Sequence, residues 1–313
     1  MPVTYVRGDD GKFIQVGPGG ATTDTTLSLA GKPADAAAVG NAMSMKANKE
    51  YVDSNIAYLS NPNLLINSDF RNPVNQRGNT SYSYSGSSVT YTIDRWCINY
   101  NSTITVNSGY VTLTGNTATN NYWNHVLEHS LSGTFTLSVS IKNTSGGTGY
   151  VFASNNNGDT ERMTLTNGVH SITFNMDGLC KVGFCSLKTG MKSDVEWVKL
   201  EYGNRATPFI PRQYAEELML CQRYHRRVYK TPIIGSSSTS TTYMLPLQFN
   251  PPMMDGYTVT LKEVFNSSGA SQSGITLSSC AGGIYNTQSL QLSKTIGQFG
   301  FVTLVFDAEI YNV

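Results

Sequence analysis

The run Asn120-Asn121-Tyr122-Trp123-Asn124 has the residue types most suited to ligand recognition in this sequence. Two large aromatic rings lie among amides; such rings can stack on the apolar face of a sugar while amides bind its hydroxyls. The polar surroundings predict a loop. Two interpretations remain: an exposed sugar-binding platform of Tyr122, Trp123 and Asn124, or a tryptophan that caps a β-sandwich, because large aromatics usually find cover.

A second candidate binding region lies near the C-terminal end. Tyr257 follows the turn-like PPMMDG, and Tyr285 with Asn286 lies in AGGIYNTQS. Glycine and proline at these positions predict loops at the end of a distal β domain. These three residues complete the set of candidate ligand-binding residues.

Catalytic chemistry has little support in the sequence. Asp94, Arg95 and Trp96 could supply the carboxylate, the guanidinium and the sugar-stacking ring of a glycosidase site. In YTIDRWCI, however, the tryptophan falls on the apolar face of a strand. We therefore expect a core tryptophan beside a salt-bridged Asp94. GxSxG, HExxH and a phosphate-binding glycine loop do not occur, so we expect no catalytic residues and no enzyme.

Metal and cofactor sites are also not expected. His125 and His129 are four apart, but no third ligand lies near them in the sequence. The five cysteines are an odd number without a CxxC pair, which predicts free thiols and no zinc. A structural calcium ion at strand ends is an alternative that we do not favour, with ligands from Asp69, Asp94 or Glu201.

Composition excludes several classes of partner. Only 14% of the 313 residues are charged and the formal net charge is +1, so nothing draws the chain to nucleic acid. No apolar run reaches the length of a membrane span, and we expect no membrane insertion. The N-terminus shows no secretory signal, so we expect synthesis in the cytoplasm and release by lysis or within a particle.

The middle and the end of the chain carry β patterns. Phe135, Leu137, Val139 and Ile141 alternate with polar residues, and Asn157-Gly158 and Asn167-Gly168 are hairpin-type turns. We predict a mainly β protein with a jelly-roll β-sandwich over residues 61–212 and a small C-terminal β-sandwich over 231–313. From Tyr214 the spacing becomes helical, which predicts a linking helix over 213–230.

The N-terminal part is predicted to serve attachment and association. Residues 1–32 contain one strand near Lys12 to Val16 and form an attachment segment or a frayed terminus. Residues 33–60 are alanine-rich and helical, coiled-coil-like, with a narrow apolar stripe and a slip near Ala47 that indicates a stutter or two helices. Several copies could close a seam formed by Val39, Met43, Val52, Ile56 and Leu59.

Three motifs together resemble a module of tail-fibre and receptor-binding proteins from tailed bacteriophages and prophages. They are NLLINSDFRNPVNQRG, YTIDRWCI and WVKLEYGNRATPFIPRQYAEELMLCQRYHRRV, and the resemblance runs from Asn63 to about Tyr229. It implies a jelly-roll domain in a homotrimeric fibre that touches the host surface. It also implies a place in the virion tail or in a phage-tail-like particle.

Three functions follow from the sequence. The first is a homotrimeric tail-fibre or receptor-binding subunit that binds a host cell-surface polysaccharide and contacts other tail or baseplate proteins through its N-terminal segment. The second is a structural baseplate or collar protein without receptor binding. The third, from the enzyme class, is a polysaccharide depolymerase.

Overall fold

A computed structural model of the chain divides it into two compact units, Met1–Leu59 and Ser60–Val313. It describes residues 4–8, 10–16, 39, 43, 59–84, 89–119, 121–245, 249–254, 257–282 and 288–309. Antiparallel strands dominate the described residues, which confirms the mainly β prediction. None of the helices in this described part has the length and apolar character needed to cross a membrane.

The first unit contains an antiparallel pair of short strands. β1 (Thr4–Arg7) pairs with β2 (Phe13–Val16), which confirms the predicted strand near the N-terminus. Val39 and Met43 have helical backbone, but Val52, Ile56 and most of residues 33–58 lie outside the described residues. The helical association segment therefore stays a prediction.

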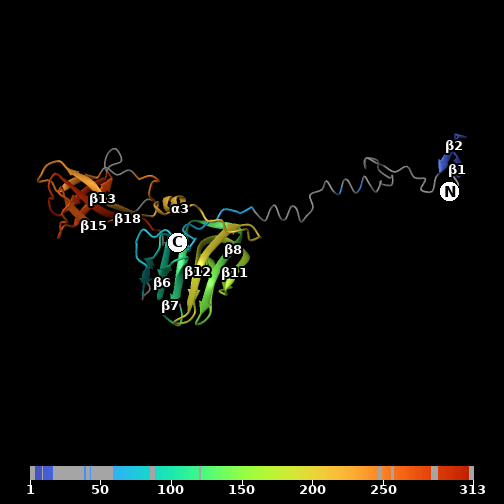
Figure 1. Cartoon of the computed structure of the whole chain (residues 1–313), viewed down its shortest axis with the longest axis horizontal. Helices are drawn as coiled ribbons and strands as arrows, with labels where there is room; N and C mark the ends of the chain where they lie inside the picture. The colour runs from blue at the N-terminus through green and yellow to red at the C-terminus, as the bar shows by residue number, and fades with distance from the viewer. Residues whose placement is uncertain are drawn as a thin grey trace. The chain divides into compact units, whose positions relative to one another are not determined.

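The second unit begins with a ten-stranded sandwich, drawn from cyan to yellow in Figure 1. One layer runs in the order β4, β5, β8, β11, β9, β10, and the other in the order β3, β6, β7, β12, β8, β11. The strands are β3 (Ser81–Ser83), β4 (Val89–Tyr91), β5 (Trp96–Asn99), β6 (Ser102–Asn107), β7 (Tyr110–Gly115), β8 (Asn121–Ser145), β9 (Gly149–Asn155), β10 (Thr160–Thr164), β11 (Gly168–Ser186) and β12 (Lys192–Tyr202).

β8 and β11 belong to both layers because each is long and bends midway. β8 has 25 residues and β11 has 19, and their pairing shifts register between Met176 and Lys181. Gly133 and Gly178 take positive φ angles of 142° and 70° at this bend. Glycine adopts such angles without the steric cost of a side chain, so the chain can turn the corner here.

The sandwich core lies between the two layers. Phe135, Leu137, Val139 and Ile141 are buried as their alternation predicts, and they belong to the same core cluster as Trp96. The Asn157-Gly158 hairpin is confirmed between β9 and β10, with Gly158 at φ 93°. The turn at Asn167-Gly168 instead joins β10 to β11, which do not pair with each other because β9 lies between them.

The predicted linking helix is shorter than the sequence pattern indicates. α3 spans Tyr214–Cys221, and the chain then enters β13 (His225–Gly235). The extension of the helix to residue 230 is therefore wrong. His225 and Val228 are buried, but they belong to a strand. Eight residue pairs between β13 and β18 take the place of the predicted hydrogen bonds of a helix.

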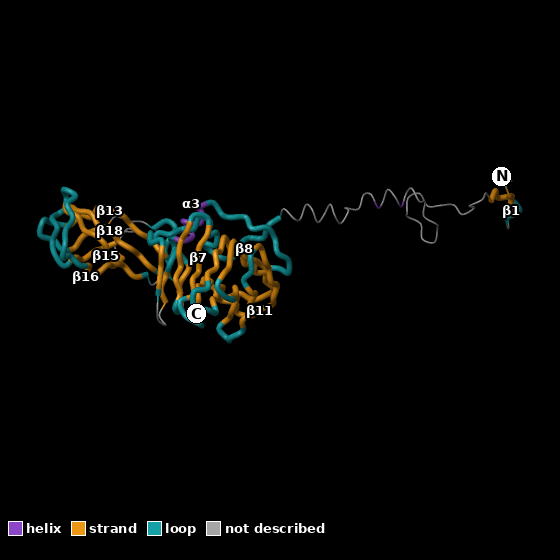
Figure 2. Tube along the Cα trace, turned by 60° about the horizontal axis from the view of Figure 1, so that its bottom comes forward, coloured by secondary structure: helices purple, strands orange, loops and turns teal. Residues whose placement is uncertain are grey.

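The C-terminal part is a six-stranded antiparallel sheet in the order β15-β18-β13-β14-β17-β16. Its other strands are β14 (Thr242–Leu245), β15 (Thr258–Asn266), β16 (Leu277–Gly282), β17 (Gln288–Leu292) and β18 (Phe299–Asp307). Tyr243, Leu304 and Phe306 are fully buried in its core. Figure 2 shows strands, in orange, throughout both sheets and the short helix α3 in purple.

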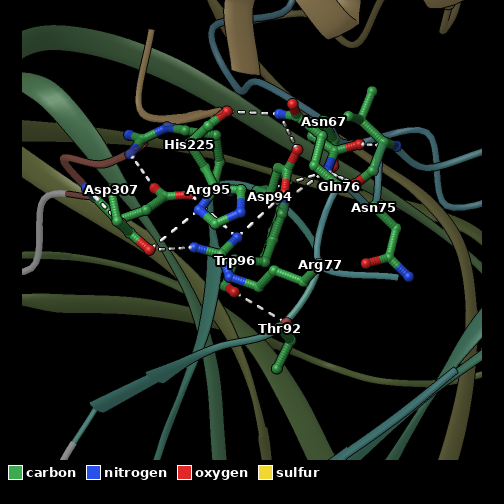
Figure 3. Close-up of polar contacts among 12 residues, drawn as sticks. Asn67, Asn75, Gln76, Arg77, Thr92, Asp94, Arg95, Trp96, His225 and Asp307 are labelled. Atoms are coloured by element: carbon green, nitrogen blue, oxygen red, sulfur yellow. Dashed lines mark hydrogen bonds and ion pairs between the residues drawn. The ribbon is translucent and has the colours of Figure 1, made fainter. Parts of the chain in front are cut away.

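A buried polar network joins the sandwich to the C-terminal sheet (Figure 3). The Arg77 guanidinium donates to Asp94 and to Asp307, each at 3.1 Å. Arg95 pairs with Glu309 at 3.0 Å, and both side chains are only 1% exposed. A buried ion pair is costly to break, because each charge would be left without its partner in a dry environment.

Candidate functional site

The structure corrects the prediction of a loop for residues 121–124, whereas Asn120 lies outside the described residues. β8 begins at Asn121, and Trp123 is fully buried, with ring centroids 4.7 Å from those of Phe70 and Trp96. Its indole N–H donates to Thr92 Oγ1 at 3.0 Å. Trp123 is therefore a core residue, as the capping interpretation held, and it offers no surface to a sugar.

Tyr122 and Asn124 point the other way, onto the outer face of the sheet. Side chains of a strand alternate between faces, so the neighbours of an inward-facing Trp123 face outward. Strand register places Tyr122 beside Asn99 of β5 and Cys185 of β11, and Cys185 beside Tyr150 of β9. These residues form one row across four strands.

A second row crosses five strands next to the first. It runs Arg162 (β10), Phe152 (β9), Gly183 (β11), Asn124 (β8) and Cys97 (β5). Gly183 has no side chain, and the Asn124 amide and the Phe152 ring occupy the space above it. Side chains of the two rows line a surface groove on this layer.

The groove has a volume of about 330 Å³. Its described lining combines aromatic rings, amides, hydroxyls and two cations, from Asn99, Tyr100, Tyr122, Asn124, Tyr150, Phe152, Ser154, Thr160, Arg162 and Lys181. We call these ten residues the outer groove. Five strands and the bend after β5 contribute to it, so the sandwich holds its walls rigidly.

The aromatic rings of the outer groove pack edge to face. Tyr122 lies 5.8 Å from Phe152 at 82°, and 6.2 Å from Tyr100 at 64°, measured between ring centroids and planes. Tyr150 lies 6.0 Å from Phe152 at 68°. Such contacts hold each ring in place, and the planes of neighbouring rings are steeply inclined to one another.

Tyr100 adopts a backbone conformation that is unusual for a large residue. Its φ angle is +75°, in the left-handed region that favours glycine. This conformation directly follows β5 and turns the Tyr100 ring toward Tyr122. Strain of this kind is held in place by the surrounding structure, and it is found preferentially at functional sites.

Asn124 supplies a hydrogen-bond acceptor without a partner. The residue is 2% exposed and lines the groove, and its Oδ1 has no hydrogen-bond partner among the described residues. Gly183 explains how the amide fits, because a Cβ there would lie 2.3 Å from Asn124 Oδ1 and 2.8 Å from Phe152 Cζ. Buried acceptors are normally satisfied, so Asn124 Oδ1 needs a donor that none of the described residues supplies.

The hydroxyls of Tyr122 and Tyr150 stay protonated at neutral pH. Burial is the main cause that raises the pKa of Tyr122, and it also raises the pKa of Tyr150. Burial likewise raises the pKa of the Cys185 thiol beside them. All three groups are therefore neutral, and the two hydroxyls can both donate and accept hydrogen bonds.

A second, larger cavity of about 640 Å³ lies beside the buried polar network. Arg77, His225 and Asp307 line it, but these groups bind one another: Asp307 Oδ2 lies 3.1 Å from both His225 Nδ1 and an Arg77 nitrogen. Its principal charged groups thus hold the two sheets together. We regard the outer groove as the stronger candidate because its acceptor is unpartnered.

The other candidate residues that the structure describes do not gather into a site. Asp94 binds Arg77 and Trp96 is fully buried, which confirms the core interpretation of YTIDRWCI. Burial raises the pKa of Asp94 to about 6. Tyr257 packs against Phe249 and Phe306 of the C-terminal core, whereas Tyr285 and Asn286 lie outside the described residues.

His125 and the three candidate calcium ligands are engaged elsewhere. His125 is buried, and its Nε2 accepts the Ile66 N–H at 3.2 Å; burial holds its pKa well below the usual value. The candidate calcium ligands are apart from one another: Asp69 binds Arg71, Asp94 binds Arg77 and Glu201 binds Lys199. Within the ranges described above, no three metal-ligating side chains come together.

Four cysteines are free and buried: Cys97, Cys180, Cys185 and Cys221. Burial raises the pKa of Cys97 to about 12, so its thiol is protonated and unreactive at neutral pH. The predicted free thiols are confirmed for these four.

No protein-family model matches the sequence, and no curated protein matches it. Solved structures that resemble it include "BiXyn10A CBM1" in its apo form, at 13% identity and a TM-score of 0.30, covering 39% of this chain and 96% of that one. A mutant of the family 29 carbohydrate-binding module CBM29-2, complexed with mannohexaose, matches at 8% identity and a TM-score of 0.28, covering 39% and 90%. What those proteins bind is a property of those proteins. The function of this chain is inferred from its own outer groove.

Proposed function

We propose that this chain binds a glycan in the outer groove. The observation that carries the proposal is Asn124, which lines the groove near Phe152 and whose buried Oδ1 has no hydrogen-bond partner among the described residues. A sugar ring presents an apolar face and several hydroxyls, and the groove offers aromatic faces beside amides and neutral phenols. One ligand class thus satisfies both kinds of surface.

Binding, without hydrolysis, is the role that the described groove residues favour. Glycoside hydrolysis generally needs two carboxyl groups on either side of the scissile bond. Among the ten residues of the outer groove there is no aspartate or glutamate. We therefore propose a recognition module, in preference to a depolymerase.

The biological setting that we propose is the tail fibre of a phage or prophage. The three motifs from Asn63 to Tyr229 support it through their resemblance to receptor-binding subunits, with the host cell-surface polysaccharide as ligand. A homotrimer would present three grooves. Each aromatic contact contributes about 0.5–1.5 kcal/mol beyond burial, so single sites bind weakly and linked sites raise the apparent affinity by roughly 10²–10⁴.

A glycan array with matched tyrosine variants tests the proposal. Labelled full-length protein is applied to bacterial polysaccharides, beside Tyr122→Ala in the outer groove and Tyr110→Ala as the control. Tyr110 is half-buried like Tyr122 but begins β7 in the other layer. We expect glycan binding that Tyr122→Ala weakens and Tyr110→Ala retains.

Two results would overturn the proposal. One is the absence of binding to any polysaccharide by the correctly folded protein. The other is binding that Tyr122→Ala leaves at full strength.

A further inference from the structure

The outer groove contains two cations on either side of one strand. Arg162 comes from β10 and Lys181 from β11, and β9 with Phe152 and Ser154 runs between them. Both are among the ten lining residues, and none of the described ten is acidic. Both charged residues of the described lining are therefore cations, in a chain whose net charge is only +1.

Arg162 is placed to bind a ligand. Its guanidinium lies 5.4 Å from the centroid of the Tyr150 ring, and its side chain is exposed. Stacking on a ring orients a guanidinium while its N–H groups stay available for hydrogen bonds. An oriented guanidinium can bind both oxygens of a carboxylate at once.

We propose that the outer groove selects an acidic saccharide, one that carries a carboxylate, over its neutral counterpart. The sugar ring packs on the aromatic residues and gives a hydroxyl to Asn124 Oδ1, while the carboxylate binds between Arg162 and Lys181. The inference rests on the proposed glycan binding and adds the charge of the ligand. The neutral rings and phenols give affinity for sugars in general, and the two cations give the preference for charge.

Paired ligands test the charge preference separately from glycan binding. Oligosaccharides of a uronic acid are compared with the same oligosaccharides after chemical reduction of the carboxyl groups, using calorimetry and the array. We expect the acidic form to bind at least about tenfold more tightly, and the difference to shrink at high salt, because exposed charges are screened.

Charge-matched variants complete the test. Arg162→Gln should remove most of the preference, so that the acidic and the reduced forms bind with similar affinity. Lys142→Gln is the control: Lys142 is also exposed and lies over a tyrosine ring, Tyr110 at 4.1 Å, but it belongs to the half of β8 in the other layer. It should leave both forms unaffected.

The outcomes separate the two proposals. Equal binding of acidic and reduced forms that Tyr122→Ala abolishes overturns the charge preference and leaves glycan binding in place. Binding of the acidic form that survives Tyr122→Ala but falls with both Arg162→Gln and Lys142→Gln overturns both, because it indicates nonspecific attraction to charge. No binding of either form, when the array is also negative, overturns both as well.

Discussion

Replacing Trp123 should damage the fold of the sandwich and leave its ligand surface intact. The side chain is fully buried, contacts Phe70, Trp96 and Phe184, and donates one hydrogen bond to Thr92. Truncation of a buried tryptophan to alanine costs about 3–5 kcal/mol. Because whole domains are stable by only about 5–15 kcal/mol, Trp123→Ala should bring the sandwich close to unfolding.

Urea denaturation followed by circular dichroism measures this loss. With a slope of about 2 kcal/mol per M, a loss of 4 kcal/mol moves the midpoint down by about 2 M. Trp123→Phe keeps most ring contacts and loses the hydrogen bond, so we expect a loss of about 1–2 kcal/mol. Trp197→Ala is the control, because Trp197 is half-buried and stacks on Phe209 at the surface of the sandwich.

Two results would refute this reasoning. The first is a midpoint for Trp123→Ala equal to that of Trp197→Ala, since a core ring must cost more to remove than a partly exposed one. The second is a folded Trp123→Phe protein that no longer binds glycan, which would make Trp123 part of the ligand site after all.

Three further predictions concern pH, assembly and the thiols. Burial raises the pKa of Asp94 from 3.8 to about 6, so the folded protein favours the protonated carboxyl. The stability that this protonation contributes is fully present below pH 3.8 and is lost as pH rises to about 6. The contribution is on the order of 3 kcal/mol, so the protein should lose stability relative to Asp94→Asn between pH 4 and 6.5, and a constant difference in urea midpoints would contradict this. Light scattering should give three times the 34.1 kDa chain mass for the full chain and a smaller assembly without residues 1–59; a monomeric full chain would exclude the trimer. Alkylation without reductant should label five thiols in denaturant and few in the native protein, and fewer than five in denaturant would reveal a disulfide.

Much of the sandwich was predictable because one-sided strands have a simple period. The alternation from Phe135 to Ile141, and the apolar position of Trp96 in YTIDRWCI, correctly gave buried faces. Trp123 was harder to place. Trp123, His125 and Leu127 share the inward face of the strand. The amides before Trp123 and the histidine on this face hide the two-residue period in the sequence.

The helix boundary failed for a different reason. His225 and Val228 fit a helical face and a strand face equally well, and only the pairing with β18 decides between them. That partner lies more than seventy residues later in the chain, so no local pattern contains the information.

The outer groove was predicted only through Tyr122 and Asn124. Its other walls come from β9, β10 and β11, where Tyr150 and Phe152 alternate with the inward-facing Val151 and Ala153. The pattern marks these residues as outward, but strand register is needed to bring them beside Asn124. Gly183 is equally invisible in the sequence, because its role depends on which side chains approach it.

The two bent strands also determine how the sandwich responds to mechanical load. β8 bonds to β5 and β11 in one layer and to β12 and β11 in the other, so the layers share continuous backbone. Sliding one layer over the other must break backbone hydrogen bonds along β8 and β11 and must also separate packed apolar side chains. Pulling on a bound ligand at the groove therefore loads both layers at once, and the sandwich should yield as a single unit at a higher force than two layers that only pack together.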